Sequence, residues 1–405
     1  MDRPYIPVTV TGKCEKFIRG GHLWVYHDEV LNIGGYYVNG DIVDVYTQKG
    51  RYLGSGYIND NSKIRVRIIS RNANDRFDEA FYRRRVRYAV DYRLTVMQED
   101  FSSCRLIFGE ADGFPGLTVD KFEDILVAQV LCMGTDRVKD MIFRALADIL
   151  GEKGRPVRAI YERNDVRVRE LEGLEEYKGF YPLDGLSRDL SGEVIITENG
   201  IRYNVDYING QKTGFFLDQK YNRRAVAKLA RGRRVLDCFT HTGAFALNAA
   251  KYAEHVTAVD ISQSAVDMAR RNAELNGITN VELVTANVFD LLSELVREGK
   301  HPYDMVILDP PAFTKSRSAT RSAERGYKEI NLKAMRLLPR GGYLATCSCS
   351  HFMPDELFRK MLDSAAADAG VSLRQIECRQ QAADHPILRG VEETDYLKFY
   401  ILQVV

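Results

Sequence analysis

The second half of the chain repeats one pattern of apolar and polar residues. After about residue 220, short apolar runs alternate with stretches in which apolar residues recur every three or four positions. Short buried strands separated by helices predict a parallel sheet that is covered on both faces. We therefore predict an α/β domain over residues 201–405, Rossmann-like and doubly wound, with a mostly parallel sheet. Its predicted strands are Arg234–Asp237, Val256–Asp260, Val281–Val284, Met305–Asp309, Leu344–Cys347 and a long closing strand at Tyr396–Val405.

The first 73 residues combine short strands with glycine-containing turns. Ile64–Ile69 alternates apolar and basic side chains over most of its length, which is typical of a strand with one solvated face. We interpret Gly34-Gly35, Asn39-Gly40 and Gly54-Ser55-Gly56 as turns between strands. These patterns predict a small β-barrel over residues 1–73. Its other strands are expected at Val8–Val10, Trp24–Tyr26 and Ile42–Tyr46.

Residues 74–200 contain both helical and strand patterns. The charged stretch from about 75 to 99 has spaced apolar residues and predicts a helix that leaves the barrel. Asn199-Gly200, within Val194–Val205, is a strong signal for a two-residue hairpin. We therefore expect a linker helix followed by a small α+β domain. Its other elements are predicted as a helix at Arg137–Leu150 and strands at Leu126–Leu131 and Ala159–Glu162.

Length and composition are typical of a soluble protein with more than one domain. The 405 residues are 28% charged and 45% hydrophobic. No apolar run approaches the roughly 18 residues that cross a bilayer, and the first residues lack the apolar stretch of a signal peptide. Seven scattered cysteines favour a reducing compartment over a disulfide scaffold. We expect a cytoplasmic protein with no membrane partner.

The formal net charge of +1 does not by itself indicate a nucleic-acid partner. Basic residues nonetheless gather at Arg83-Arg84-Arg85-Val86-Arg87. Such a run is more often a solvated helix face than a binding surface. It gains interest only if a neighbouring module binds nucleic acid.

The turn after the first strand of the C-terminal domain indicates the kind of cofactor. This turn, from Asp237 to Phe245, contains Gly243 alone, whereas a dinucleotide-binding loop needs three glycines to approach a pyrophosphate. S-adenosyl-L-methionine has no pyrophosphate. It suits a tight turn followed by a helix N-terminus, whose free amides bind its carboxylate.

Two polar residues at neighbouring strand ends suit the rest of this cofactor. Asp260 would accept both ribose hydroxyls, and Asn287 is placed to contact the adenine. The alternative is that Asp237 and Asp260 merely cap helices. Two strand-end acids in register with the turn favour the nucleoside cofactor. The residues predicted to bind it are Asp237, Phe239, Thr240, Gly243, Asp260, Asn287 and Asp309.

The fourth and fifth strands end in residues that suit methylation of a pyrimidine. Asp309 precedes Pro310-Pro311, a stiff platform that can face a flat polar ring. Cys347 and Cys349 share one face if the fifth strand continues that far. Carbon five of a pyrimidine is a poor nucleophile until a thiolate adds to carbon six. We predict Cys349 as this nucleophile and Asp309 as the acid near ring nitrogen three.

The remaining cysteines are expected to be inert, buried side chains. Cys238 is expected to pack inside the cofactor turn. A metal site at Cys347 and Cys349 is disfavoured, because no second ligand pair is spaced to complete it. The other cysteines with this structural interpretation are Cys14, Cys104, Cys132 and Cys378.

A basic segment follows Asp309 and so borders the predicted site. Between residues 315 and 328 the only acid is Glu324. A polyanion that approaches the site would find partners for its phosphates here. The predicted RNA-binding residues are Lys315, Arg317, Arg321, Arg325 and Lys328.

Several strings of residues, spread over essentially the whole chain, resemble motifs of one known family. Gly20–Tyr26 and Gly40–Val43 resemble a PUA signature, and Phe108–Leu117 and Tyr161–Val166 resemble a central domain. The most specific string is Gln211–Gln219, which resembles the start of a methyltransferase domain. The chain is thus similar to the PUA-domain-containing ribosomal RNA cytosine-5 methyltransferases that modify the large subunit.

This resemblance implies S-adenosyl-L-methionine as cofactor and methylation of carbon five of a cytidine in large-subunit ribosomal RNA. It places the family's nucleophile on Cys349 rather than Cys347, its acid on Asp309, and adds Gln219 to the cofactor-binding residues. Relatives often have Asp where this chain has Asn287; since an amide can still pair with adenine, we expect altered affinity rather than lost function. The family is commonly a homodimer.

Two other functions compete with this one. Amino-directed RNA or DNA methyltransferases also use a proline-rich strand end, but they favour an aromatic residue directly after it, where this chain has Ala312 and then Phe313. The second competing function is that of a PUA-type RNA-binding or assembly factor whose methyltransferase domain is inactive. A nicotinamide-dependent dehydrogenase is disfavoured by the missing glycines.

Overall fold

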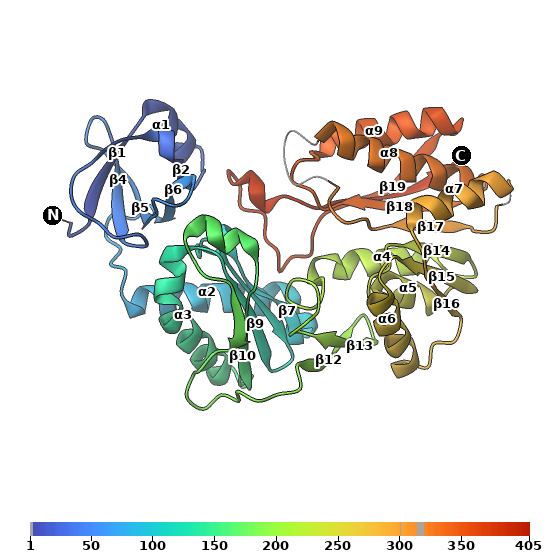
Figure 1. The fold of residues 1–405 in the computed structure, drawn as a ribbon, viewed down its shortest axis with the longest axis horizontal. Helices are drawn as coiled ribbons and strands as arrows, with labels where there is room; N and C mark the ends of the chain where they lie inside the picture. Colours follow the sequence, from blue (N-terminus) through green and yellow to red (C-terminus); the bar gives the residue numbers. More distant parts are fainter. Residues whose placement is uncertain (1–2, 300, 314–319) are drawn as a thin grey trace. The chain divides into compact units, whose positions relative to one another are not determined.

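The computed structural model describes residues 3–299, 301–313 and 320–405. The chain divides into two compact units, and the division falls within a β-hairpin. The first unit includes both the N-terminal strands and the central segment; the domain boundaries after residues 73 and 200 remain predictions. The first unit contains Met1–Ile196, Val205–Leu217 and Ala383–Thr394, and the second contains Thr197–Asn204, Asp218–Ala382 and Asp395–Val405 (Figure 1).

A six-stranded sheet forms the N-terminal part of the first unit (blue in Figure 1). Its order is β2-β6-β5-β4-β1-β3, and its neighbours are antiparallel except β1 and β4. Val8, Val43 and Val66 are fully buried in its aliphatic core. All four predicted strands are present. The elements are β1 (Ile6–Val10), α1 (Gly12–Arg19), β2 (Trp24–Tyr26), β3 (Val30–Ile33), β4 (Ile42–Thr47), β5 (Tyr52–Ile58) and β6 (Ile64–Ser70).

One turn predicted in this region is wrong. Gly54-Ser55-Gly56 lies inside β5 rather than between two strands. A Cβ on Gly56 would collide with the backbone carbonyl of Arg67 in β6. The glycine therefore permits β5 and β6 to approach closely. Close approach of another backbone is a common reason for glycine inside a strand.

A five-stranded sheet and two long helices complete most of the first unit. The order is β11-β10-β9-β8-β7, with β9 and β10 parallel and the other neighbours antiparallel. The predicted helices and strands of this segment are present, with α2 and α3 lying beside one another (Figure 1). The elements are α2 (Glu79–Met97), β7 (Ser103–Phe108), β8 (Leu117–Phe122), β9 (Ile125–Val130), α3 (Met133–Glu152), β10 (Ala159–Asn164) and β11 (Tyr177–Phe180).

Two of the four arginines in the cluster on α2 pair with α3. Arg83 pairs with Asp148 and Glu152 at 2.8 and 2.6 Å, and Arg87 pairs with Glu152 at 2.8 Å. These pairs agree with the interpretation of the cluster as a solvated helix face. Arg85 forms no such pair and is considered below.

A seven-stranded sheet forms the centre of the second unit. Its order is β16-β15-β14-β17-β18-β20-β19, and β16 to β18 are mutually parallel. The closing strand β20 is antiparallel to both of its neighbours. This confirms the predicted doubly wound, mostly parallel sheet. The strands are β14 (Arg234–Cys238), β15 (His255–Asp260), β16 (Val281–Thr285), β17 (Met305–Leu308), β18 (Tyr343–Ser348), β19 (Leu373–Arg379) and β20 (Lys398–Val404).

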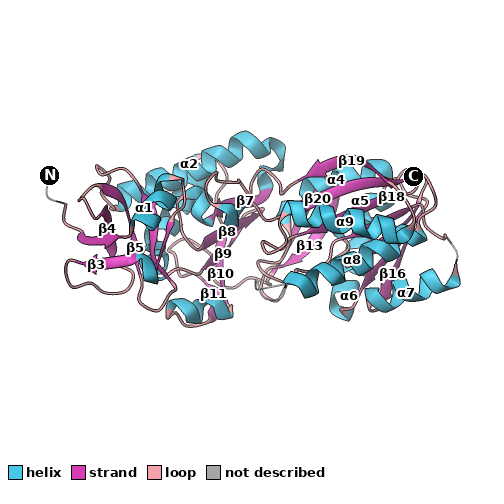
Figure 2. Ribbon diagram, turned by 90° about the horizontal axis from the view of Figure 1, so that it is seen from above, coloured by secondary structure: helices cyan, strands magenta, loops and turns pink. Residues whose placement is uncertain are grey.

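Helices cover both faces of this sheet (Figure 1). Figure 2 shows α8 and α9 in cyan beside the magenta strands. Tyr327 of α8 and Phe358 of α9 are buried on one face, while Phe245 of α5 stacks on Phe399 of β20 on the other. The helices are α4 (Lys220–Leu229), α5 (Ala244–Ala250), α6 (Gln263–Leu275), α7 (Val288–Glu298), α8 (Thr320–Leu337) and α9 (Asp355–Ala369); the predicted hairpin, β12 (Glu193–Glu198) and β13 (Ile201–Asp206), precedes them.

Candidate active site

Three aspartates gather at the carboxyl ends of adjacent strands in the second unit. Asp237 lies in β14, Asp260 ends β15, and Asp309 directly follows β17. β14 pairs with both β15 and β17, so the strand order reverses at this point. Ligands of open α/β sheets bind in the crevice at such a switch point. The structure thus brings together the three acids that the sequence placed at one edge.

Asp237 is fully buried and only partly satisfied. Its Oδ2 accepts a hydrogen bond from the Thr240 hydroxyl at 2.6 Å, while Oδ1 makes none with any described residue. Burial raises the pKa of Asp237 to about 7, and the nearby carboxyl groups of Asp309 and Asp260 add to the rise. A cationic ligand group beside Oδ1 would restore the charged form.

The turn that follows has an unusual backbone. Phe239 and His241 have φ values of 64° and 50°, and Gly243 has 84°. Left-handed conformations of residues other than glycine cost energy and are concentrated at functional sites. A Cβ on Gly243 would lie 3.1 Å from Cβ of Ala269 in α6, so glycine also permits close packing there. The Thr242 hydroxyl is buried without a hydrogen-bond partner among the described residues.

Asp260 is held rigidly at the strand end. Its Oδ2 accepts from the amide of His241 and its Oδ1 from the amide of Ser262, both at 2.9 Å. Each carboxylate oxygen can accept a further hydrogen bond. The N-cap residues of α5 and α6 are Gly243 and Ser262, so neither acid is itself a helix N-cap. A backbone hydrogen bond from Ala246, in the first turn of α5, nonetheless acts against the rise in the pKa of Asp237.

Asn287, which is predicted to contact the adenine, has a structural role at the start of α7. It is the N-cap of α7, and its side-chain oxygen accepts from the amide of Phe289 at 2.9 Å. Its side chain is exposed at the end of β16. The side-chain oxygen is committed to the helix, and contact with adenine remains a prediction.

Gln219, Asp309 and Cys347 form one buried hydrogen-bonded cluster. The Cys347 thiol donates to Oδ1 of Asp309 at 2.9 Å. Nε2 of Gln219 donates to the same oxygen at 3.1 Å and to the Cys347 sulfur at 3.4 Å. Asn222 fixes the Gln219 side chain by donating to Oε1 at 2.6 Å.

Burial governs the acidity of both groups in this cluster. It raises the pKa of Asp309, although the hydrogen bonds from Cys347 and Gln219 act against the rise. It also raises the pKa of the Cys347 thiol well above its usual range, and the adjacent Asp309 adds to this effect. Cys347 therefore stays protonated, while Asp309 is biased towards a proton donor.

Cys349 lies just beyond β18, which ends at Ser348. The strand therefore does not continue as far as Cys349, which is the condition for predicting that Cys347 and Cys349 share a face. Both cysteines nevertheless pack on the same face of the sheet. Cys349 is half-buried whereas Cys347 is fully buried. The Ser348 hydroxyl donates to the hydroxyl of Tyr327 at 3.0 Å, which anchors the strand end.

Lys398, which sequence reasoning missed, lies beside this segment. Its buried Nζ donates to the carbonyls of Ser350 and Tyr396 at 2.6 and 2.7 Å. Burial lowers its pKa to about 8, and Cys349 is the group that most opposes this shift. A lysine at the start of the mostly apolar closing strand is the signal that could have identified it.

The other cysteines mostly have the predicted character. Cys14, Cys104, Cys132 and Cys238 are buried. Cys378 is exposed, so the prediction of a buried side chain is wrong there. Cys378 lies on β19, which is an edge strand with several exposed residues. The sequence of β19 is short and rich in polar residues, so it does not indicate that Cys378 is at the edge of a sheet.

The basic segment is described only from residue 320. Lys315 and Arg317 lie outside the described residues. Arg321 and Arg325 are exposed on α8, and Lys328 pairs with Asp368 at 2.6 Å. RNA binding by this segment remains a prediction.

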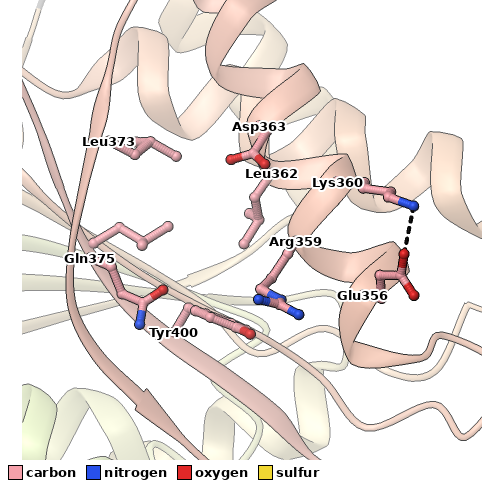
Figure 3. A pocket seen from close by; sticks show the side chains of 9 residues that line it. Glu356, Arg359, Lys360, Leu362, Asp363, Leu373, Gln375 and Tyr400 are labelled. Atoms are coloured by element: carbon pink, nitrogen blue, oxygen red, sulfur yellow. Dashed lines mark hydrogen bonds and ion pairs between the residues drawn. The ribbon is translucent and has the colours of Figure 1, made fainter.

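A cavity of about 480 Å³ lies elsewhere in the second unit, between α9 and the strands β19 and β20. Figure 3 shows Lys360 paired with Glu356 at its rim, a contact of 2.7 Å. None of the predicted site residues lines it. The strand-end aspartates therefore remain the candidate site.

The strand-end residues fit the chemistry of S-adenosyl-L-methionine. The turn presents a buried acceptor on Asp237 and a buried hydroxyl on Thr242, both without partners among the described residues. An amino-acid zwitterion carries the matching ammonium and carboxylate. Asp260 adds the fixed carboxylate that suits two ribose hydroxyls. Together these residues would hold the cofactor.

The described residues lack two features that mark other classes of protein. No described helix has the length and apolar character needed to span a membrane. Within the same residues, no cluster of three or more His, Cys, Asp or Glu side chains is arranged for a metal ion.

Comparison with known proteins agrees with this architecture. Residues 175–398 match the S-adenosylmethionine-dependent methyltransferase family, and residues 8–71 match the PUA-like domain. The predicted PUA-like barrel is thereby confirmed. The chain is 40% identical to the ribosomal RNA large subunit methyltransferase I of Aeromonas salmonicida over 398 residues, covering 96% of this chain and 97% of that protein.

Two solved structures share the fold over nearly the whole chain. A putative SAM-dependent methyltransferase from Streptococcus mutans has a TM-score of 0.81 at 22% identity, covering 98% of this chain and all of its own. A putative methyltransferase in complex with SAH has a TM-score of 0.84, with the same identity and coverage.

Proposed function

The chain belongs to the S-adenosylmethionine-dependent methyltransferase family, and from this premise we propose that it methylates carbon five of a cytidine in large-subunit ribosomal RNA. Its relatives named as ribosomal RNA large subunit methyltransferase I support this substrate. A PUA-like domain in the same chain also supports RNA. We place the reaction in the cytoplasm, with assembly as a homodimer as a further expectation.

The proposed chemistry begins with Cys349. Its thiolate adds to carbon six of the cytosine, and the electrons of the C5–C6 double bond make carbon five nucleophilic. Asp309 gives its proton to ring nitrogen three as the charge moves there. S-adenosyl-L-methionine supplies the methyl group that carbon five accepts.

The remaining steps restore the ring and the enzyme. A base removes the proton from carbon five, and the C6–sulfur bond breaks to release the Cys349 thiolate. Nitrogen three returns its proton to Asp309, so both groups begin the next turnover in their original states. Lys398 holds the Ser350 carbonyl and thereby fixes the segment that presents Cys349.

The observation that carries the proposal is the state of Asp309. Its carboxyl lies at the end of β17, beside the end of the strand that leads to Cys349. Burial raises its pKa and so favours the protonated form. A proton donor and a half-buried thiol at neighbouring strand ends are what addition to a pyrimidine requires.

Product analysis tests this proposal. Large-subunit ribosomal RNA from a deletion strain is incubated with the protein and S-adenosyl-L-methionine that carries a labelled methyl group, then digested to nucleosides. The expected product is 5-methylcytidine. A methylated exocyclic amine would instead support the amino-directed rival, and no heat of S-adenosyl-L-methionine binding in calorimetry would support an inactive RNA-binding factor.

The contacts of Phe313 argue against the amino-directed rival. Its ring packs 4.6 Å from that of Tyr327 and 5.7 Å from that of Phe289. The first aromatic residue after the double proline is thus part of a hydrophobic cluster. This use of Phe313 favours a structural role over stacking on a target base.

A further inference from the structure

The first unit contains a groove that the proposed active site does not use. It has a volume of about 620 Å³ and is lined by the end of β6, one side of α2, the turn at residues 110–113, and the segment that contains Pro386 and Leu388. All of these residues belong to the first unit. We call it the β6–α2 groove.

Every acidic side chain that lines the β6–α2 groove is already paired with an arginine. These ion pairs cancel the negative charge that the groove would otherwise present to a ligand. The pairs are Asp75 with Arg84 at 3.2 Å, Glu110 with Arg67 at 3.3 Å, and Asp112 with Arg93 at 2.5 and 2.8 Å.

Two arginines of the groove remain without such a pair. Among the described residues, no carboxylate forms an ion pair with Arg85 or with the exposed Arg71. The Arg85 guanidinium instead lies 4.8 Å from the ring centre of Phe81. Burial lowers the pKa of Arg85, as expected for a cation that is shielded from water without full compensation.

Gly113 lies directly beside the Arg85 side chain. Gly113 has a φ of 75°, and a Cβ at this position would collide with Nη1 of Arg85. Glycine there leaves the space that the guanidinium occupies. The Arg85 guanidinium thus lies in the groove between Gly113 and the ring of Phe81.

An exposed aromatic residue lies next to this charge. Tyr88 follows Arg85 by three residues on α2, which places both side chains on the same side of the helix. Its side chain lines the groove and is 63% exposed. Tyr92, one turn further, also lines the groove and donates its hydroxyl to the Ala383 carbonyl at 2.8 Å. The groove thus combines cations with an aromatic surface.

We propose that the β6–α2 groove binds a single-stranded segment of RNA, with a phosphate at Arg85 and Arg71 and a base stacked on Tyr88. Cationic grooves with exposed aromatic side chains are the usual means of holding single-stranded nucleic acid. This inference rests on the proposed function, because it assigns part of the RNA substrate to a surface outside the catalytic sheet. RNA is favoured over an acidic polypeptide, since carboxylates alone would not use the exposed ring of Tyr88.

The test is binding of a fluorescein-labelled twelve-nucleotide oligocytidine RNA to the full chain, measured by fluorescence anisotropy. Arg85→Gln and Tyr88→Ala should each weaken binding at least fivefold, within the range known for lost stacking or phosphate contacts. Arg85→Gln should also reduce the slope of log affinity against log salt by about 0.7. Tyr88→Phe keeps the ring and should bind like the wild type.

Arg83→Gln is the matched control. It removes the same charge from the same helix, but Arg83 pairs with α3 and does not line the groove. The proposal is overturned if Arg85→Gln and Tyr88→Ala bind within twofold of wild type, if the wild type does not bind the oligonucleotide, or if an oligoglutamate of equal charge displaces the RNA equally well. Tyr88 is exposed, so its variant should fold even if Arg85→Gln does not.

Failure of the groove can be separated from failure of the proposed function. Methyl transfer to ribosomal RNA by the wild type tests the active site, whereas anisotropy tests the groove without any cofactor. Normal methyl transfer with unchanged RNA binding by both groove variants would reject the groove alone. Absent methyl transfer with weakened binding by those variants would reject the proposed reaction and retain the groove.

Discussion

The thiol of Cys347 donates a hydrogen bond to Oδ1 of Asp309 across 2.9 Å. The cysteine nearest the proposed acid is therefore the one not proposed as nucleophile. Cys347 is fully buried and its pKa is raised by burial, which suits a permanent hydrogen-bond donor. Its task in this account is to tune and position Asp309.

Cys347→Ala should retain methyl transfer and alter its pH dependence. The thiol stabilises the Asp309 carboxylate, so its removal raises the pKa of Asp309 further. Because Asp309 acts as a protonated acid, kcat/KM should persist to higher pH than in the wild type, with kcat reduced less than about tenfold. A pH–rate profile measures this. Complete loss of activity in a folded Cys347→Ala protein would move the nucleophile from Cys349 to Cys347.

Asp260→Ala should weaken the binding of S-adenosyl-L-methionine at least tenfold, because a hydrogen bond to a charged group contributes about 1.5–3 kcal/mol. Isothermal titration calorimetry gives the dissociation constant. Asp267→Ala is the control, since Asp267 lies on the adjacent helix α6, is exposed, and accepts a hydrogen bond from Gln263 of the same helix. A dissociation constant within twofold of wild type would remove Asp260 from the cofactor site.

The pKa of Asp237 makes stability depend on pH. Its carboxyl has a pKa of about 7 in the folded protein and a usual value of 3.8. Between these values the folded state holds a proton that the unfolded chain has released, so stability falls as pH rises through this window and is constant above it. The effect is on the order of a few kcal/mol.

Asp237→Asn should remove this dependence. Thermal unfolding without cofactor is compared at pH 5 and pH 8 for both proteins. The wild type should lose several degrees more than Asp237→Asn between the two conditions. Parallel behaviour of the two proteins would show that Asp237 is already charged at pH 5.

Glu198 and Arg223 form a buried ion pair in the second unit. Nε and Nη2 of Arg223 donate to the two carboxylate oxygens at 2.6 and 2.7 Å, and both side chains are almost fully buried. Glu198→Gln leaves the guanidinium buried without its counter-charge, which should cost about 3–5 kcal/mol. The control is Glu377→Gln, whose pair with Arg379 is about one-third exposed and should contribute less than about 1 kcal/mol. Equal shifts of the urea midpoint in the two variants would contradict this difference.

Features with a local cause could be predicted from the sequence. Asp237, Asp260 and Asp309 each end a short apolar run, and parallel strands bring such ends to one edge. The mostly parallel sheet with helices on both faces follows from the alternation of strands and helices. The sequence predicts the location of these three aspartates because each location is determined by the short segment that contains the residue.

Features that depend on contacts between residues far apart in the chain could not be predicted from the sequence. The sequence pattern predicts a turn at Gly54 and Gly56, whereas Gly56 is required by the carbonyl of Arg67 in another strand. The sequence pattern does not predict the edge strand β19, because a register shift between Gln375 and Glu377 interrupts its alternation. The contacts of Gln219 with Asp309 and Cys347 span 90 and 128 residues, and no local pattern encodes them.

The most direct test of the central claim is capture of the covalent adduct. RNA that contains 5-fluorocytidine at the modified position has no proton on carbon five to remove, so methylation should leave the enzyme bonded to carbon six. With S-adenosyl-L-methionine, the wild type and Cys347→Ala should form a complex stable to denaturing gel electrophoresis, and mass spectrometry should locate the RNA on Cys349. Cys349→Ala should form none. An adduct on another residue, or an undiminished adduct with Cys349→Ala, would contradict the account.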